Sequence, residues 1–468
     1  MKNMKTNSVV SDGGTSFYLL FISLVSAMGG LLFGYDWVLV GGAKPFYEAY
    51  FGITGSPVMQ GWVMGSAILG CLAGVMVAGS LADRYGRKPL MLVASLIFIA
   101  AALGTGAATA LEWFIVFRIL GGVGIGIASN LSPMYIAEVS PGHVRGKFVS
   151  INQLTIVLGI LAAQVVNWLI ADPVLPGEDI VMSWNGQMGW RWMFWSGGVP
   201  AVFYLCLLFF IPESPRWLVT HSQYIKASVV LKRIGGDGYA QREMDSIRTS
   251  DIQQEGKCGI RELFRGKMPG ILLIGVVVAV FQQWCGLNVV FNYAQEIFAA
   301  AGYGVSDILF NIVVTGITNV LFTLVGMYTV DRLGRRVLLL FGAAGLGMVY
   351  LLMGLCYYLH VTGWAVLFMV VLAIACYAMT LAPVTWVVIS EIFPNRIRGM
   401  AMAVSTFALW AACFVLTYTF PLFNAGLGAY GTFWLYALIC LLGFVFIKAY
   451  LPETKGKSLE EIEQELTK

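Results

Sequence analysis

Two oppositely charged residues lie inside long apolar stretches of the chain, where charge is otherwise rare. Asp36 stands in the first of these stretches and Arg118 in a later one. An unpaired carboxylate in apolar surroundings is unfavourable, so Asp36 is expected to be either protonated or paired, with Arg118 as its partner. A carboxylate that alternates between an arginine and a proton can link proton uptake to a change of conformation. A permanent structural ion pair is the alternative.

Carboxamide and aromatic side chains form a second group inside the apolar stretches. Gln282, Gln283 and Asn288 share one stretch with Asn292, and Gly286 between them can break a helix. Polar residues inside a membrane span face the bundle interior or a cavity, and carboxamides both donate and accept hydrogen bonds. The group therefore suits a ring-shaped molecule with many hydroxyl groups, whereas hydrogen bonds between helices and anchoring at the lipid interface are the alternative roles. Its further members are Gln153, Asn319, Trp386 and Trp410.

A third group of residues recurs with a period of about 250 residues. The matched signals are Asp83-Arg-Tyr-Gly-Arg-Lys88 with Asp331-Arg-Leu-Gly-Arg-Arg336, then Glu138, Pro141, Arg145 and Gly146 with Glu391, Pro394, Arg398 and Gly399, and finally Pro212-Glu213 with Pro452-Glu453. Three matched signals in the same order indicate two homologous halves in parallel orientation, an arrangement associated with alternating access.

The repeated acidic and basic residues are expected at helix ends on one face of the protein. Ion pairs among them could latch the two halves in the outward-facing state and release them in the inward-facing state. The alternative is that they only cap helices and fix the orientation in the membrane. The residues of this expected latch are Asp83, Arg87, Glu138, Arg145, Asp331, Arg335, Glu391 and Arg398.

Composition indicates which elements must position these groups. Hydrophobic residues make up 58% of the 468 positions, charged residues only 12%, and the mean hydropathy is +0.78. Soluble domains average about 25% charged residues, so the chain is expected to lie in a bilayer. A spanning helix needs about 20 mostly apolar residues. Such stretches occur at 16–42, 58–81, 89–109, 112–137, 147–171, 192–211, 269–298, 306–330, 337–359, 363–391, 399–423 and 430–451. The sequence therefore predicts an all-α integral membrane protein with twelve transmembrane helices in two homologous six-helix bundles.

Loop charge predicts the orientation of these helices. Lys and Arg are concentrated in the loops that follow the even-numbered helices, and such loops face the cytoplasm, so both termini are expected there. The one long polar segment carries apolar residues at helical spacing and is expected to form amphipathic cytoplasmic helices. The expected domains are a first bundle at 1–213, the linker at 214–267, a second bundle at 268–452 and a cytoplasmic tail at 453–468.

Other functional classes receive little support from the sequence. The net charge of +4 comes without a basic run, so no nucleic-acid partner is expected. None of the eight cysteines forms a metal-ligand spacing, and His143, His221 and His360 stand apart, so neither a metal site nor a cofactor nor an enzymatic centre is expected. The first apolar stretch is too long for the core of a cleavable signal peptide.

Several motifs together resemble the sugar porter family of the major facilitator superfamily over nearly the whole chain. They are Gly79-Ser-Leu-Ala-Asp-Arg-Tyr-Gly-Arg-Lys88, Pro212-Glu-Ser-Pro-Arg-Trp-Leu218, Gln282-Gln-Trp-Cys-Gly-Leu-Asn288, Asp331-Arg-Leu-Gly-Arg-Arg336 and Pro452-Glu-Thr-Lys-Gly456. Within that family the chain looks most like bacterial proton-coupled symporters of xylose and hexoses. The resemblance implies a monomeric carrier in the cell membrane that moves a monosaccharide, such as D-xylose or D-glucose, together with a proton.

The resemblance also assigns roles to residues. It implies that amides hydrogen-bond the sugar and that aromatic rings line it. It further implies that Asp36, with Arg118, couples transport to protons, because passive glucose uniporters of the family carry Asn at this position. The residues implied for the sugar are Gln153, Gln282, Gln283, Asn288, Asn292, Asn319, Phe33, Trp386 and Trp410.

The chain departs from the family pattern at three positions. Leu409 stands where relatives have Gln or Asn, Asn292 replaces the first of two gating tyrosines, and Ile160 replaces a glutamine. Passive uniport is the alternative function. A non-transporting sugar sensor is a further alternative, less expected because the chain ends soon after Pro452 and lacks the long tail of known sensors.

Overall fold

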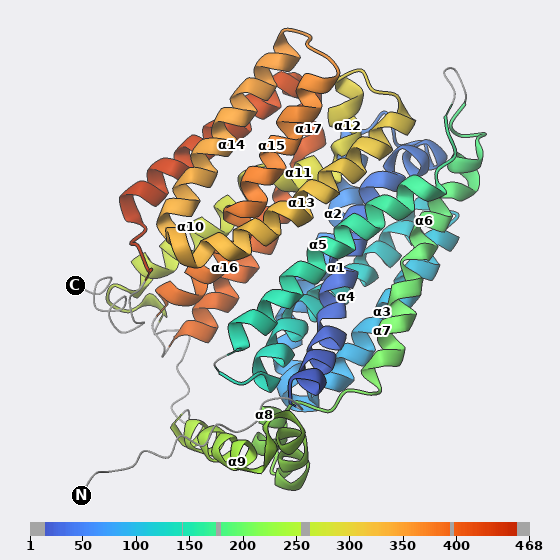
Figure 1. Ribbon diagram of the computed structural model, residues 1–468. Helices are drawn as coiled ribbons and strands as arrows, with labels where there is room; N and C mark the ends of the chain where they lie inside the picture. Colours follow the sequence, from blue (N-terminus) through green and yellow to red (C-terminus); the bar gives the residue numbers. More distant parts are fainter. Residues whose placement is uncertain (1–14, 143, 175–178, 254–262, 394–396, 456–468) are drawn as a thin grey trace, which may run out of the picture.

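Long apolar stretches fold as helices in a bilayer because a helix satisfies its backbone hydrogen bonds within its own segment. The computed structural model describes residues 15–142, 144–174, 179–253, 263–393 and 397–455, and these residues contain helices and no strand. Figure 1 shows two helical bundles side by side.

The first half of the chain forms the bundle coloured blue to green in Figure 1. Its helices are α1 (Thr15–Phe51), α2 (Pro57–Tyr85), α3 (Arg87–Ala107), α4 (Leu111–Val139), α5 (Arg145–Ile170), the short π-helix η1 (Asn185–Gly189), α6 (Trp190–Ser196) and α7 (Gly198–Leu208).

The second half forms the bundle coloured yellow to red. Its helices are α10 (Met268–Trp284), α11 (Leu287–Asn292), α12 (Ala294–Ala300), α13 (Val305–Leu333), α14 (Arg335–Tyr358), α15 (Trp364–Met379), α16 (Leu381–Ile392) and α17 (Arg398–Tyr450).

The number of membrane crossings agrees with the sequence. Within the described residues, 10 helices are long and apolar enough to span a bilayer. One of them, α17, has 53 residues and turns back at Gly428, where φ is 69°, so it supplies two crossings. The consecutive pieces η1, α6 and α7 supply another. The prediction of twelve spans in two bundles is thus confirmed.

The first span differs from its predicted length. It was expected to end at residue 42, but α1 continues to Phe51. Lys44 Nζ and Glu48 Oε1, one helical turn apart, are separated by 3.0 Å, and both side chains are buried. This pairing allows two charged residues to prolong a buried helix beyond the apolar stretch.

Two other predicted spans are interrupted. Gly286, with φ of 89°, separates α10 from α11, as its position suggested. Thr380 lies outside the helical region and separates α15 from α16. Both interruptions lie within the second bundle. Each leaves backbone N–H and C=O groups without their helical hydrogen bonds inside a span, which is tolerated only where protein or a cavity surrounds the backbone.

The linker helices α8 (Pro215–Thr220) and α9 (Tyr224–Gln253) lie beneath the first bundle in Figure 1, and α9 contacts α1. A glycine with φ of 78°, Gly236, interrupts α9. We call the end of the bundles near α8 and α9 the linker end, and the opposite end the far end.

Small residues hold the helices of the first bundle together. An added Cβ at Gly70 on α2 would lie 2.0 Å from the Ile119 carbonyl oxygen of α4, and one at Gly122 would lie 1.9 Å from the Ala67 oxygen. Only glycine permits this approach of the two backbones, as at many interfaces between membrane helices.

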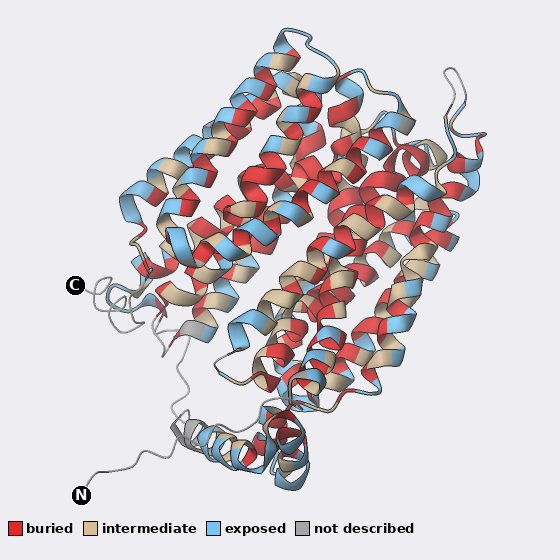
Figure 2. Ribbon diagram, in the orientation of Figure 1, coloured by how far each residue is buried: buried red, intermediate tan, exposed pale blue. Residues whose placement is uncertain are grey.

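The outer surface of the bundles carries large apolar side chains. Figure 2 shows buried residues facing the bundle interiors and exposed ones facing outward. Among the exposed residues are Phe209, Phe210, Leu441 and Leu442. Exposed apolar surface of this extent is typical of a protein surrounded by lipid.

Candidate functional site

A chain of hydrogen-bonded amides lies at the break between α10 and α11. Gln282 Nε2 donates to Tyr377 Oη at 2.6 Å, and Gln283 Nε2 donates to Gln282 Oε1 at 2.7 Å. Asn288 Nδ2 in turn donates to Gln283 Oε1. Three of the predicted amides therefore form one connected group. Tyr377 on α15 was not predicted, because a lone tyrosine in an apolar stretch gives no spacing signal.

Three aromatic rings form a contact between the two bundles. Phe33 and Trp37 on α1 have ring centroids 5.9 Å apart. Trp410 on α17 lies 5.8 Å from Phe33 and 5.9 Å from Trp37. Phe33 and Trp410 were predicted, whereas Trp37 was missed. Its position one helical turn after Phe33 is the signal that could have found it.

The predicted ion pair is present on the first-bundle side of these rings. Arg118 Nη1 lies 3.1 Å from Asp36 Oδ2. The Arg118 side chain is 4% exposed and the Asp36 side chain is 23% exposed. The arginine is therefore buried, whereas the aspartate is partly accessible to solvent. Arg118 Nε is buried and has no hydrogen-bond partner in the described chain. The Asp36 carboxylate forms this one ion pair within the described residues.

A small cavity connects the ion pair with the second bundle. Asp36, Trp37 and Arg118 line one side, and Asn292 of α11 lines the other. The cavity has room for about one water molecule. Asn292 Oδ1 is buried and makes no hydrogen bond within the described residues. A free polar atom thus faces the same small space as the carboxylate.

The remaining predicted site residues do not hydrogen-bond with the amide chain within the described residues. The side chains of Gln153 on α5 and Asn319 on α13 form no hydrogen bond within the described part of the chain, and α5 packs against α13 across the two bundles. Trp386 on α16 is 38% exposed and pairs with no other ring of the described residues. Leu409, the departure beside Trp410, is buried.

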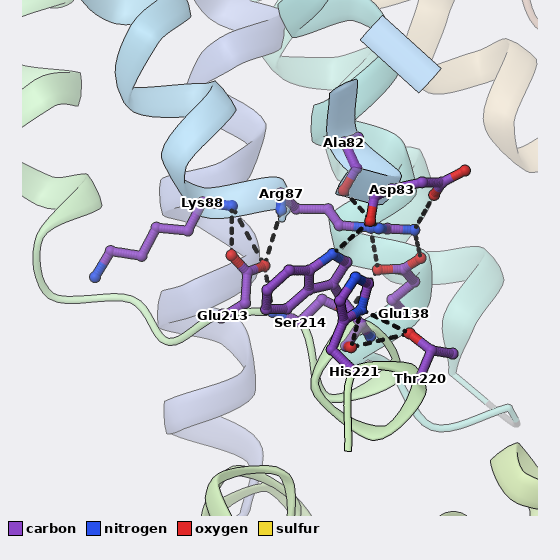
Figure 3. Close-up of polar contacts among 10 residues, drawn as sticks. Ala82, Asp83, Arg87, Lys88, Glu138, Glu213, Ser214, Thr220 and His221 are labelled. Atoms are coloured by element: carbon purple, nitrogen blue, oxygen red, sulfur yellow. Dashed lines mark hydrogen bonds and ion pairs between the residues drawn. The ribbon is translucent and has the colours of Figure 1, made fainter. Parts of the chain in front are cut away.

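At the linker end, the first bundle has an internal network of charged groups, drawn in Figure 3. Arg87 Nη2 lies 2.9 Å from Glu138 Oε1 and 3.2 Å from Asp83 Oδ1. The Glu213 carboxylate accepts hydrogen bonds from the backbone N–H groups of Arg87 and Lys88, which begin α3. Burial raises the pKa of the Glu213 carboxyl, and these N–H donors oppose the rise.

The second bundle repeats this network. Arg335 Nη2 lies 3.2 Å from Glu391 Oε1, and the Glu453 carboxylate accepts from the backbone N–H groups of Arg335 and Arg336. Thr454 Oγ1 donates to Glu391 at 2.6 Å, as Ser214 Oγ donates to Glu138. The internal repeat read from the sequence therefore corresponds to a repeated three-dimensional network.

Five of the eight expected latch residues are paired within their own half in this conformation, namely Asp83, Arg87, Glu138, Arg335 and Glu391. Every ion pair between described residues at the linker end joins residues of the same half or of the linker. Arg145 is exposed and its charge lowers the pKa of Tyr239 on α9, although burial, the larger effect, raises that pKa to about 12. The side chains of Asp331 and Arg398 lie outside the described residues. Pairing between the halves in another conformation stays a prediction.

Close contacts between the halves occur toward the far end. An added Cβ at Gly61 on α2 would lie 2.2 Å from the Tyr418 carbonyl oxygen of α17. At Gly41 on α1 it would lie 3.1 Å from the Phe291 oxygen of α11. Backbones that approach this closely leave no passage between these segments, so the site is closed off at the far end along them.

Comparison with known proteins agrees with this architecture. The family model of the sugar (and other) transporters matches residues 22–466. The chain is 36% identical to the D-xylose-proton symporter of Escherichia coli strain K12, with 96% of each chain covered. It is 34% identical to the arabinose-proton symporter of Bacillus subtilis, with 99% of each covered.

A solved structure is also similar in three dimensions. The xylose transporter of Escherichia coli in an inward-open conformation superimposes with a TM-score of 0.84 at 34% identity, covering 96% of this chain and 99% of the other. Its fold is that of the major facilitator superfamily, with the two bundles described above. The chain belongs to the sugar (and other) transporter family.

Proposed function

We propose that the protein is a proton-coupled symporter that moves a monosaccharide across the cell membrane by alternating access. The substrate is a pentose or hexose such as D-xylose or D-glucose. The observation that carries this proposal is the buried Asp36–Arg118 pair, which lies beside the aromatic rings that join the two bundles. A group that can bind a proton is thereby next to a site that can bind a sugar.

The sugar site is proposed to lie between the bundles, around the amide chain and the three rings. Gln282, Gln283 and Asn288 offer donors and acceptors that suit ring hydroxyls, and their present bonds to one another can be exchanged for bonds to a sugar. The aromatic faces suit the apolar face of the ring. The remaining proposed contacts are Gln153, Asn292, Asn319, Phe33, Trp386 and Trp410.

Proton coupling is proposed to work through competition for Asp36. When Asp36 is ionised, Arg118 holds it in the arrangement described above, at 3.1 Å. When Asp36 binds a proton, its attraction to Arg118 weakens and the helices α1 and α4 that carry them are free to shift. Protonation then favours one access state, because the carboxyl group interacts differently in the two states.

The linker end is proposed to face the cytoplasm, together with both termini. The end of α2 and the start of α3 carry Arg84, Arg87 and Lys88 at that end, and positively charged segments between spans stay on the cytoplasmic side. The domains proposed are the bundles at 1–213 and 268–452, the linker at 214–267 and the tail at 453–468. The carrier is proposed to act as a monomer.

The linker-end networks are proposed to exchange partners during transport. In the present conformation the far end is closed along the contacts of Gly41 and Gly61, and Arg87 and Arg335 pair within their own halves. In the outward-facing state the same groups are proposed to pair across the halves and close the linker end.

Sugar uptake into proteoliposomes with and without an inward proton gradient tests the function. We expect radiolabelled sugar to accumulate above its outside concentration only when the gradient is present. Uptake that merely equilibrates under both conditions would make the protein a passive uniporter, and sugar binding without uptake would make it a sensor. A panel of pentoses and hexoses in the same assay identifies the substrate.

A further inference from the structure

A buried lysine lies at the far end, away from the groups assigned above. Lys44 on α1 is 1% exposed, and its ammonium group contacts two carboxylates. One is Glu48, one turn further along α1, at 3.0 Å. The other is Glu296 on α12, which belongs to the second bundle and is 26% exposed.

Neighbouring side chains complete this group. Gln60 Nε2 on α2 donates to Glu48 Oε2 at 3.1 Å. The Lys44 ammonium lies over the Tyr293 ring, 5.1 Å from its centroid, and Tyr293 also belongs to the second bundle. We call Lys44, Glu48, Gln60, Tyr293 and Glu296 the Lys44 cluster. Its ammonium is thus held by one bundle through Glu48 and by the other through Glu296 and the Tyr293 face.

The Lys44–Glu296 contact is the ion pair that joins the two halves among the pairs of the described residues. Every other such pair connects residues of one half or of the linker. Removing one partner of a buried ion pair is strongly destabilising, because the other charge is left without compensation. A cross-bundle pair therefore stabilises the conformation in which both bundles meet at the far end.

We propose that the Lys44 cluster is an electrostatic lock that holds the far end closed and sets the balance between the two access states. This inference rests on the alternating access proposed above. Closure forms the contact between Lys44 and Glu296, and opening breaks it. Nothing close to Lys44 along the chain indicates this role, because its partner Glu296 lies 252 positions away.

Glu48 makes the lock reversible. It lies on the same helix as Lys44, so the two residues stay together when the bundles separate. An ammonium that lost its only partner would resist opening, since an unpaired buried charge is very unfavourable. Opening breaks the contacts with Glu296 and Tyr293 but leaves the ammonium paired with Glu48. Glu296 then reaches solvent, to which it is already partly exposed.

Distances between spin labels at the far end test the lock directly. Gly55 and Gly304 are exposed positions in different halves, and an added Cβ meets nothing within 4 Å at Gly55 and only Asp307 Oδ2, at 3.9 Å, at Gly304. Both are changed to cysteine and labelled in nanodiscs without sugar. The background carries serine in place of Cys206, Cys258 and Cys356, and the other cysteines are buried.

We expect Glu296→Gln to raise the ratio of the long-distance to the short-distance population about tenfold, because a charge-assisted contact is lost from the closed state only. The matched control is Glu112→Gln, which removes the same charge from an exposed carboxylate at the start of α4 that forms no hydrogen bond or ion pair within the described residues. This control should leave the ratio unchanged.

Two results would overturn the proposal in different ways. If the parent shows two populations but Glu296→Gln behaves like Glu112→Gln, the lock is wrong and the transport function stands. If the parent shows a single population with and without sugar and at every pH tested, alternating access itself fails, and the lock fails with it.

Discussion

The two ends of the molecule use charge in different ways. At the linker end, Arg87 pairs with Glu138 and Arg335 pairs with Glu391, so the same network occurs once in each half. At the far end, Lys44 pairs across the halves with Glu296. The repeated network holds the helices of one bundle together, whereas the single contact holds one bundle to the other. A duplicated fold thus supplies two scaffolds, and residues that are not duplicated connect them.

In the middle of the molecule, too, each half contributes a different group of polar side chains. The ion pair of Asp36 and Arg118 belongs to the first half, and the amide chain of Gln282, Gln283 and Asn288 belongs to the second. The proposed proton site therefore belongs to the first bundle, whereas the proposed sugar site takes its amide chain from the second. In the proposed mechanism the two sites communicate through relative motion of the bundles, and the contacts at the two ends are proposed to regulate that motion.

The largest expected effect comes from removing the titratable group of the first half. Asp36→Asn keeps the size of the side chain but cannot bind and release a proton. We expect the variant to bind sugar and to exchange it at equal concentrations, and to lose accumulation driven by a proton gradient entirely. Counterflow and gradient-driven uptake in proteoliposomes measure the two activities. Retained accumulation would reduce Asp36 and Arg118 to a structural pair.

The repeated networks should differ in strength although they share a geometry. Arg87 and Glu138 are each 9% exposed, whereas Arg335 and Glu391 are 14% and 22% exposed. Arg87→Ala leaves a buried carboxylate unpaired and should lower the free energy of unfolding by about 3 kcal/mol. Arg335→Ala should lower it by about 1 kcal/mol, since solvent compensates part of the loss.

Thermal unfolding in detergent measures this difference. The matched control is Arg84→Ala, because Arg84 is exposed and contacts only the Tyr85 ring in the described chain. It should change the melting temperature little. Equal losses for the two network variants would mean that the halves are equivalent at this end and that exposure does not decide the strength of the pair.

The scaffold could be read from the sequence to a greater extent than the site could. Twelve apolar stretches and three repeated signals were sufficient for the two bundles, because bilayer thickness and turn chemistry act locally along the chain. The pairing of Asp36 with Arg118 also followed, since each charge had few possible partners in apolar surroundings. These predictions depended on one residue or one stretch at a time.

Contacts between the bundles could not be predicted in this way. Tyr377 and Glu296 gain their roles from residues that lie far away in the sequence, and nothing in their own neighbourhoods marks them. Trp37 also contacts the other half, but its position one helical turn after Phe33 could have indicated it. Lys44 is an example in which local sequence was misleading. A lysine after an apolar stretch normally marks the end of a span, but α1 continues past Lys44 to Phe51. Its partner Glu48 continues the helix instead.

Removing an amide of the second half should weaken sugar binding without affecting proton coupling. Gln283→Ala deletes a donor to Gln282 and the acceptor for Asn288. We expect affinity to fall about 10- to 100-fold, because each hydrogen bond in such a site contributes about 1 kcal/mol or more. Isothermal titration of the purified variant measures the change. Unchanged affinity would remove the amide chain from the sugar site.

The smallest of these effects should arise where the two halves meet, at Trp37. Its ring contacts Phe33 of its own helix and Trp410 of the other half, and it lines the cavity that contains Asp36. Trp37→Ala removes an aromatic face while leaving the amides and the ion pair in place. Because ring contacts contribute about 0.5–1.5 kcal/mol beyond area burial, affinity should fall about three- to tenfold. Trp113→Ala, at an exposed position on α4, is the matched control and should bind sugar like the parent. A variant that binds normally but accumulates less sugar would place Trp37 in the coupling between halves, whereas one that binds weakly and remains coupled would place it in the sugar site.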